Sequence, residues 1–246
     1  MSDIPPPKGF YFKLKVSETL FPIQDQKGTP SCWAQSVAFL VGYELKRKHK
    51  DIQDYIASPQ HLIDNLYKES NAVKFFKKGP NSNDLIPCSL AEMEYYECSA
   101  RHALNYIMVN GIYLESQYKF KGKTSNKRMI SGERIRIEKI QYFSSTPSKN
   151  QVKKILQKGH PILAEIYMSD SFSSHHGEHV YRTDPGKPED GLHSIVVIGT
   201  GYDNGELYCE IRNSWGSEWG AGGNAKVLAS FVHLVGYIEG AYLEDE

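Results

Sequence analysis

Residues 26–34 read Gln-Lys-Gly-Thr-Pro-Ser-Cys-Trp-Ala, and Cys32 stands directly before a helical repeat. Apolar residues recur at helical spacing up to Leu45, which predicts a helix from about Cys32 to Lys46 with Ser31 as its N-cap. Unpaired N–H groups in the first turn of a helix favour an anion, so the Cys32 thiol is expected to ionise more readily than a free thiol of pKa about 8.5. Free cysteines are more often small buried hydrophobes, so this position alone does not identify a nucleophile.

A histidine and an asparagine flank a predicted hairpin in the second half of the chain. Segments 194–200 and 207–213 look extended and enclose Tyr202-Asp203-Asn204-Gly205, a strong hairpin-turn signal. A two-residue Asn204-Gly205 turn would place Asn213 opposite Val196, and a bulge would move this register by a residue or two. His193 and Asn213 are therefore expected at the same end of one sheet.

Together these motifs resemble the active-site segments of papain-like cysteine peptidases. The first stretch has the family's glutamine six residues before Cys-Trp-Ala, Gly191-Leu192-His193-Ser194 resembles its histidine strand, and Asn213-Ser214-Trp215-Gly216 resembles its asparagine motif. The resemblance is continuous from about residue 10 to 240. It implies that Cys32 is the nucleophile and His193 its proton partner, and that Asn213 orients His193. Gln26 is expected to hold the oxyanion, with Trp33 and Trp215 supporting the site.

The resemblance also implies an α+β fold with two lobes and the active site in the cleft between them. The helical lobe is expected at about 17–134 and the antiparallel β-barrel-like lobe at about 135–246, with residues 1–16 packed on the latter. The residue pattern agrees, because Ser58-Pro59 and Ser99 open two further helices, and Gly111 can end the second of them. Strand patterns follow residue 130, interrupted by one helix at about 150–158.

One segment departs from the family pattern. Where the family has a glycine-rich stretch that pairs with the bound peptide, this chain has Glu94-Tyr95-Tyr96-Glu97-Cys98-Ser99, and Thr29 replaces the family's bridging cysteine. The bulky Tyr95, Tyr96 and Glu97 are expected to narrow the peptide groove. The residues expected to contact substrate are Tyr95, Tyr96, Gly191, Leu192 and Ser194.

Composition excludes several classes of partner. Twenty-nine basic residues balance twenty-nine acidic ones, so neither nucleic acid nor an anionic membrane is an expected partner. The N-terminus lacks the apolar stretch of a signal peptide, and no recognisable pro-segment precedes the catalytic domain. With only four cysteines, the chain as written is expected to be cytoplasmic, although members of the family are usually vacuolar, lysosomal or secreted. Whether Cys88 and Cys98 form a disulfide stays open.

No cofactor or metal is expected. The run His175-His176-Gly177-Glu178-His179 has zinc-ligand atom types, but its order is not HExxH, and a solvated loop is the favoured interpretation.

The leading functional hypothesis is a monomeric, thiol-dependent endopeptidase that acts on polypeptides, with cystatin-type proteins as inhibitors by family resemblance. The alternatives are a catalytically silent binding protein with the same fold and an acyltransferase that uses the same thiol chemistry.

Overall fold

The computed structural model describes residues 11–16, 21–68, 74–79, 84–125 and 131–244. The chain divides into two compact units, the first made of residues 1–25 and 141–237 and the second of residues 26–140 and 238–246. The sequence placed residues 21–25 in the helical lobe, whereas they belong to the first unit. It placed residues 135–140 and 238–244 in the β-rich lobe, whereas they belong to the second unit with the helices. Residues 1–10, 17–20 and 126–130 of the predicted lobes lie outside the described residues.

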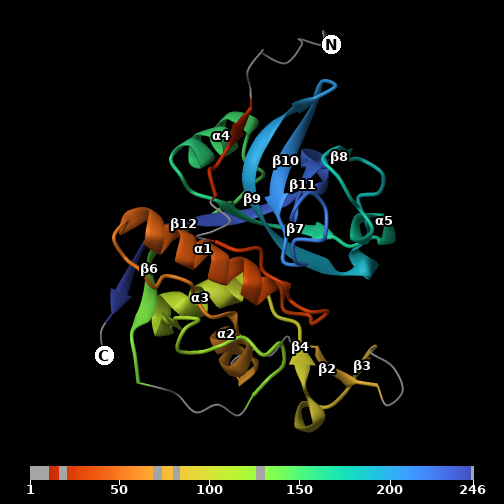
Figure 1. Cartoon of the computed structure of the whole chain (residues 1–246). Coiled ribbons are helices and arrows are strands. Elements are labelled where there is room, and N and C mark those ends of the chain that lie inside the picture. Colours follow the sequence, from red (N-terminus) through yellow and green to blue (C-terminus); the bar gives the residue numbers. More distant parts are fainter. Residues whose placement is uncertain (1–10, 17–20, 69–73, 80–83, 126–130, 245–246) are drawn as a thin grey trace. The chain divides into compact units, whose positions relative to one another are not determined.

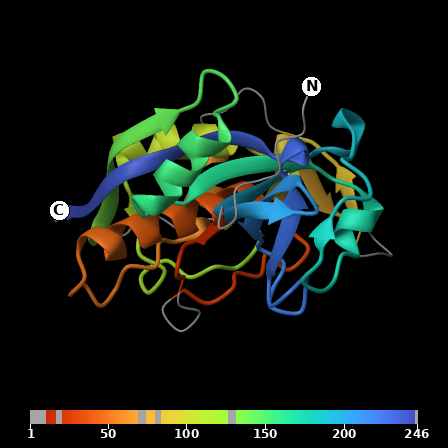
Figure 2. The same ribbon diagram turned by 90° about the horizontal axis from the view of Figure 1, so that it is seen from above.

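The second unit is built on the three predicted helices. They are α1 (Cys32–Lys48), α2 (Pro59–Asn65) and α3 (Ala100–Asn110), and α1 is the long orange helix in Figure 1 and Figure 2. α1 contacts both α2 and α3. Leu40, Leu62 and Leu104 are completely buried in this core, and each such side chain stabilises the fold by roughly 2 kcal/mol. Among the described residues, no helix is both long enough and apolar enough to cross a bilayer.

Serine and glycine residues mark the ends of these helices, as the sequence predicted, although not every cap uses a side-chain hydrogen bond. Ser58 accepts a hydrogen bond from the His61 N–H at the start of α2, and Gly111 ends α3 with a φ of 72°. Ser31 is the N-cap residue of α1, as predicted, and its carbonyl accepts the N–H groups of Ala34 and Gln35, but its side chain makes no capping hydrogen bond. The Ser31 hydroxyl instead shares a 2.8 Å hydrogen bond with the Thr29 hydroxyl.

A small sheet that the sequence did not reveal follows α2 and the 3-10 turn η1 (Leu66–Lys68). Its order is β3 (Leu85–Pro87), β2 (Phe75–Lys78), β4 (Tyr95–Tyr96), and the turn η2 (Leu90–Glu92) lies between β3 and β4. β2 separates the outer two strands, which places β3 and β4 two strand spacings apart, or about 10 Å, with Cys88 just after β3 and Cys98 just after β4. A disulfide needs Cα atoms within about 7 Å, and both thiols are free.

The remaining strands of the second unit are β5 (Ile112–Tyr113) and most of β6 (Arg134–Tyr142), which pair antiparallel with Ile112 opposite Ile135. β6 and β12 (His233–Glu244) each cross the boundary between the units along the chain.

The first unit is built on a sheet of order β12-β7-β9-β10-β11-β8. Its strands are β7 (Ile162–Tyr167), β8 (Val180–Tyr181), β9 (Leu192–Asp203), β10 (Glu206–Arg212), β11 (Asn224–Leu228) and the start of β12, and β1 (Phe12–Lys13) adds to the edge of β9. β8 pairs parallel with β11, and the other pairings are antiparallel.

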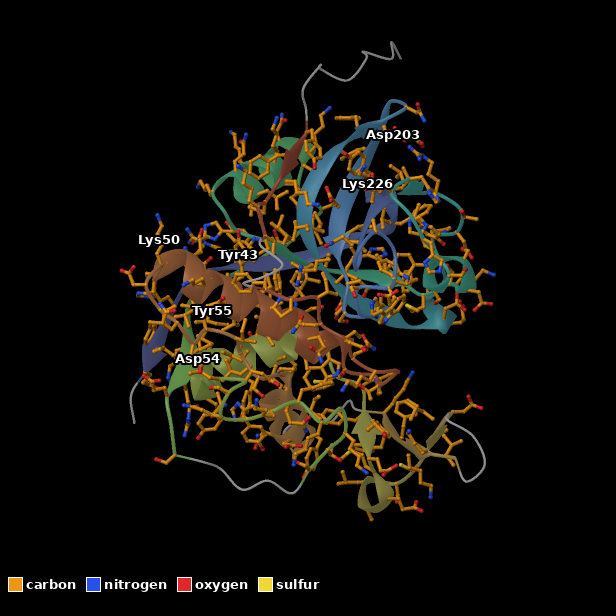
Figure 3. The ribbon with its side chains drawn as sticks, in the orientation of Figure 1. Tyr43, Lys50, Asp54, Tyr55, Asp203 and Lys226 are labelled. Atoms are coloured by element: carbon orange, nitrogen blue, oxygen red, sulfur yellow. The ribbon has the colours of Figure 1, made fainter. Side chains whose placement is uncertain are left out.

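The β9–β10 hairpin is the predicted one. Asp203, labelled in Figure 3 at the hairpin tip, pairs with Glu206, and Asn204 and Gly205 both have positive φ, as a tight two-residue turn requires. A bulge after Glu210 shifts the register by one, so Arg212 pairs with Val196. The predicted pairing of Asn213 with Val196 is therefore off by one residue, and the bulge brings Asn213 closer to the level of His193.

Short helices complete the first unit. α4 (Lys149–Gln157) begins with a capping box in which Ser148 and Gln151 each bond the other's backbone N–H. α5 (Asp170–Ser173) and the turns η3 (Pro188–Asp190) and η4 (Ala229–Phe231) were not predicted.

His61 makes the second unit sensitive to acid. Its ring is buried against Tyr113 and Tyr118, and burial, followed by the charge of Arg134, lowers the His61 pKa from 6.5 to about 3. Above pH 6.5 both folded and unfolded states hold a neutral ring. Below pH 6.5 only the unfolded state gains the proton, so the free energy of unfolding decreases as the pH is lowered, until the folded ring is protonated near pH 3. At about pH 5 the loss should be about 2 kcal/mol.

This loss can be measured by urea unfolding of the wild type and His61→Asn at about pH 7.5 and about pH 5. The asparagine can still accept the Tyr113 N–H, which His61 Nδ1 accepts at 3.4 Å, but does not titrate. We expect the variant to lose less stability on acidification than the wild type. Equal losses would contradict the assignment to His61.

Candidate active site

A tight turn positions the Gln26 side chain in the second unit. Lys27 and Gly28 both have positive φ, at 53° and 67°, which reverses the chain between Gln26 and Thr29. The Gln26 carbonyl accepts the Thr29 N–H at 3.1 Å and the Thr29 hydroxyl at 2.6 Å, while the Gln26 amide donates back to the Thr29 carbonyl at 2.5 Å. Gln26 is thus buried and held by reciprocal hydrogen bonds, with an amide that carries a second N–H.

Cys32 is the first residue of α1 and is half-buried. The first turn of α1 contains no acidic residue, and the last turn contains Lys46, Arg47 and Lys48. The basic residues act on the negative end of the helix dipole, whereas the lack of a carboxylate in the first turn leaves the positive end at Cys32 uncompensated there, which favours a thiolate.

Trp33 anchors the start of α1. It is 2% exposed, its indole N–H donates to the Pro30 carbonyl at 3.0 Å, and its ring packs 5.5 Å from that of Tyr96. The Pro30 carbonyl therefore faces the helix, and Trp33 holds the loop that precedes Cys32 against the rest of the unit.

The first unit brings His193 and Asn213 together. His193 Nε2 lies 2.7 Å from Asn213 Oδ1, which also accepts the Ser214 N–H at 2.8 Å. Because an amide oxygen can only accept, Nε2 carries the proton, and the lone pair of a neutral ring lies on Nδ1. The asparagine thus fixes both the orientation and the tautomer of the histidine.

The protonation of His193 depends on its surroundings. Burial lowers the pKa of His193 to about 4, and the hydrogen bond to Asn213 acts in the opposite direction. Without a nearby anion the ring is therefore neutral at pH 7, and its Nδ1 can accept a proton.

Aromatic rings enclose the His193–Asn213 pair. Trp215 lies 4.5 Å from the His193 ring, and it is packed in turn by Phe172 at 5.7 Å and by Trp219 at 5.3 Å. This sheath excludes water from one side of the imidazole. The sequence identified Trp215 as a supporting residue but missed Phe172, which lies on α5. Trp219 could have been found from the Trp219-Gly220 pair that follows the asparagine motif.

The residues on both sides of Asn213 are tied to an early segment of the same unit. The buried Arg212 guanidinium donates to the Phe21 carbonyl at 2.6 Å and the Pro22 carbonyl at 2.7 Å. Further along, Asp25 forms a β-bridge with Trp215. These contacts fix the backbone on both sides of the asparagine motif.

The residues predicted to contact substrate have different environments. Tyr95 and Tyr96 are buried, and the Tyr96 hydroxyl donates to the carbonyls of Leu62 and Ile63, so Tyr96 acts as a core contact of α2. Ser194 is buried in β9. Gly191 has a φ of 85°, and Leu192 is 52% exposed, so this loop end is the accessible part of the predicted set.

Residues 176–179 of the histidine run are exposed, as expected for a solvated loop, whereas His175 packs against the aromatic sheath. His175 is buried beside Trp219 and Tyr181, and burial, with the neighbouring His179 and His176, lowers its pKa. Within the described part of the chain, no three metal-ligating side chains converge.

Comparison with known proteins agrees with this arrangement. Residues 11–237 match the family model described as papain family cysteine protease. A cathepsin L-like proteinase of Phaedon cochleariae is 24% identical over 220 residues, which are 88% of this chain and 59% of the relative. The chain spans about half the length of other relatives, such as peptidase 1 of Psoroptes ovis, at 49%.

Solved structures show the same fold. A structure from work on the mite allergens Blo t 1 and Der p 1 superposes with a TM-score of 0.71 at 22% identity, covering 94% of this chain and 70% of the other. The Carica candamarcensis cysteine protease CMS1MS2, solved with E-64, gives a TM-score of 0.65 at 18% identity over 96% and 99% of the two chains. The fold is papain-like, as the sequence predicted.

Proposed function

Because the chain belongs to the papain family of cysteine proteases, we propose that it is a thiol-dependent endopeptidase in which Cys32, His193 and Asn213 form the catalytic triad. The observation that supports this most directly is the 2.7 Å contact from His193 Nε2 to Asn213 Oδ1. It leaves Nδ1 as the ring atom that exchanges protons with a thiol, the role a general base requires.

The proposed reaction has two halves. The Cys32 thiol passes its proton to His193 Nδ1, and the thiolate attacks the carbonyl carbon of the peptide bond. The imidazolium then protonates the leaving amine, which departs and leaves a thioester on Cys32. Water, deprotonated by the same Nδ1, attacks the thioester, and the acid product leaves as the thiol regains its proton.

The low pKa of His193 bears on the first step. Burial disfavours the imidazolium, so a thiolate next to it is needed to hold the proton on the ring. The helix-terminal position of Cys32 favours that thiolate. In this proposal the two charges stabilise each other, which neither group would achieve alone.

The substrates proposed are polypeptides, and cystatin-type proteins are the proposed class of inhibitor by family resemblance. Leu192, exposed at the start of the histidine strand, is the predicted substrate contact best placed to meet an apolar side chain of a peptide.

An epoxysuccinyl peptide inhibitor tests the proposal directly. Under reducing conditions at about pH 6, we expect a single covalent label per chain, located at Cys32 by peptide mapping. Cys88 and Cys98 are internal controls, because they are half-buried free thiols on the same chain. An unlabelled Cys32, or labelling of all three thiols at equal rates, would count against an activated nucleophile. Labelling without peptide hydrolysis would instead favour the acyltransferase or silent-binding alternatives.

Asn213→Ala should weaken catalysis without abolishing it. Loss of the acceptor frees the imidazole to rotate and change tautomer, so we expect kcat/KM for a peptide substrate to fall about 10- to 100-fold. Asn213→Gln, which keeps an amide on a longer side chain, should recover part of this loss. Steady-state kinetics measure both variants, and an unchanged kcat/KM in Asn213→Ala would remove the asparagine from the triad.

A further inference from the structure

A cavity lies in the first unit, away from His193 and Asn213 along the β9–β10 hairpin. It encloses about 450 Å³, which falls in the size range of small-molecule pockets. Its lining is more apolar than polar, and five aliphatic side chains contribute to it: Val152 of α4, Leu207 of β10, Leu228 of β11, and Val232 and Leu234 near the start of β12.

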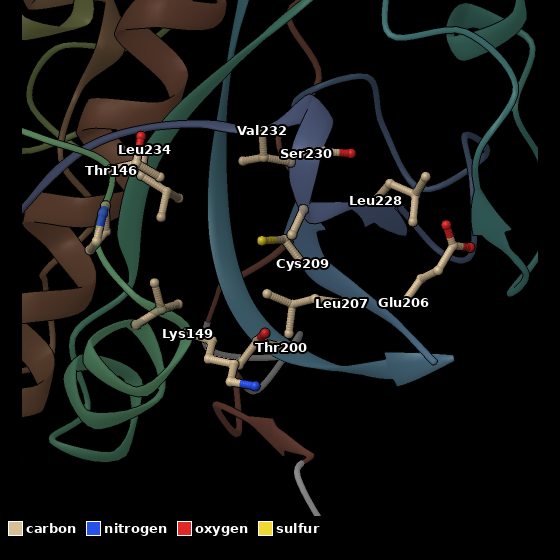
Figure 4. A pocket seen from close by; sticks show the side chains of 13 residues that line it. Thr146, Lys149, Thr200, Glu206, Leu207, Cys209, Leu228, Ser230, Val232 and Leu234 are labelled. Carbon is tan, nitrogen blue, oxygen red and sulfur yellow. The ribbon is translucent and has the colours of Figure 1, made fainter. Parts of the chain in front are cut away.

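The floor of the cavity carries little polarity. Cys209 is 3% exposed, and in Figure 4 its sulfur points into the space between Val232 and Leu207. Burial raises the pKa of this thiol to about 12, so it stays protonated and behaves as a small hydrophobe. The Thr200 hydroxyl, also at the floor, already donates to the Tyr208 carbonyl at 3.0 Å. The interior therefore suits an alkyl chain.

The rim of the cavity is charged. Two charged residues line it, Lys149 and Glu206. Glu206 forms an ion pair with Arg182 at 2.9 Å, whereas the Lys149 ammonium donates at 2.9 Å to the hydroxyl of Tyr202, a neutral group. Lys149 is also the first residue of the nine-residue helix α4, whose dipole adds to the positive potential there. An anionic group at the rim would thus meet a cation whose described partner is uncharged.

We propose that this cavity binds a medium-chain aliphatic carboxylate, with its alkyl chain among the aliphatic walls and its carboxylate at Lys149. The cavity belongs to the first unit alone, and the proposal does not depend on the peptidase activity. Each methylene buried in such a pocket should strengthen binding about fourfold, until the chain fills the space.

Calorimetric titration of the whole chain with hexanoate, octanoate and 1-octanol tests the proposal. Octanoate has two more methylenes than hexanoate, so we expect it to bind about 15-fold more tightly. Lys149→Ala should weaken octanoate binding about fivefold and leave 1-octanol binding unchanged. Lys158→Ala, at the other end of α4 and outside the cavity lining, is the matched control and should bind like the wild type.

A second variant tests the cavity itself. Cys209→Met lengthens the floor side chain into the cavity and should weaken both octanoate and 1-octanol at least tenfold. Ser230→Trp, at an exposed lining position, serves the same purpose if thermal unfolding shows that Cys209→Met does not fold.

Three results would overturn the proposal. One is an absence of octanoate binding to the wild type up to about 5 mM. Another is unchanged octanoate binding in a folded cavity-filling variant, which would place the ligand elsewhere on the surface. The third is an equal effect of Lys149→Ala and Lys158→Ala, which would remove the carboxylate from Lys149.

Discussion

Replacing Cys32 by alanine is expected to lower kcat/KM for peptide hydrolysis by about 10⁴-fold or more. The variant keeps the helix, because alanine is a strong helix former, and it removes the atom that attacks the carbonyl. Residual hydrolysis would come from oriented water and the oxyanion donors alone. Initial rates with a fluorogenic peptide, and with an unfolded protein as substrate, measure the loss.

The matched controls are Cys88→Ala and Cys98→Ala. Both thiols are half-buried near the small β2–β4 sheet, and we place neither in the catalytic machinery. Each variant should therefore retain wild-type kcat/KM within about twofold. Retention of more than about a tenth of the activity in Cys32→Ala would show that another group is the nucleophile.

The elements with strong periodicity could be predicted from the sequence, because their local preferences and their packing agree. α1 and α3 begin and end within two residues of the predicted positions, and α2 begins where Ser58-Pro59 predicted, with Pro59 and Gly111 as boundary signals. The Asn204-Gly205 turn correctly set the β9–β10 hairpin. Pro59, Gly111 and Gly205 are informative because the backbone preferences of proline and glycine suit them to helix boundaries and tight turns.

The elements that the sequence missed are short or depend on tertiary context. Strands of two to four residues, such as β2 and β4, carry too little alternation to be distinguished from loop. The bulge after Glu210 and the rearranged Ser31 hydroxyl both depend on contacts that no local pattern encodes. The burial of Tyr96 could not be predicted for the same reason, because its hydroxyl bonds to α2, which lies more than thirty residues earlier in the chain.

Within the site, the sequence could predict the partners that lie on one hairpin. His193 and Asn213 follow from the turn and the strand lengths, and their contact is present. Phe172 could not be found this way, because its packing on Trp215 joins α5 to a loop more than forty residues later. The pairing of Cys32 with His193 remains a prediction from the order of the motifs and from family membership.

Gln26→Ala is expected to have the second largest effect on catalysis. If the second N–H of the Gln26 amide stabilises the oxyanion, its removal should lower kcat about 10²- to 10³-fold with little change in KM, because the interaction forms in the transition state. The same substitution removes the bond to the Thr29 carbonyl, which should lower the free energy of unfolding by only about 1 kcal/mol.

Kinetics and urea unfolding of the same Gln26→Ala sample separate these two roles. Gln53→Ala is the matched control, because Gln53 also donates to a nearby backbone carbonyl, that of Asp51, on an exposed loop of the same unit. It should leave both kcat and stability close to those of the wild type. A Gln26→Ala protein that loses stability but keeps kcat would make Gln26 a structural residue of the 26–29 turn, and the oxyanion would then depend on the backbone N–H of Cys32.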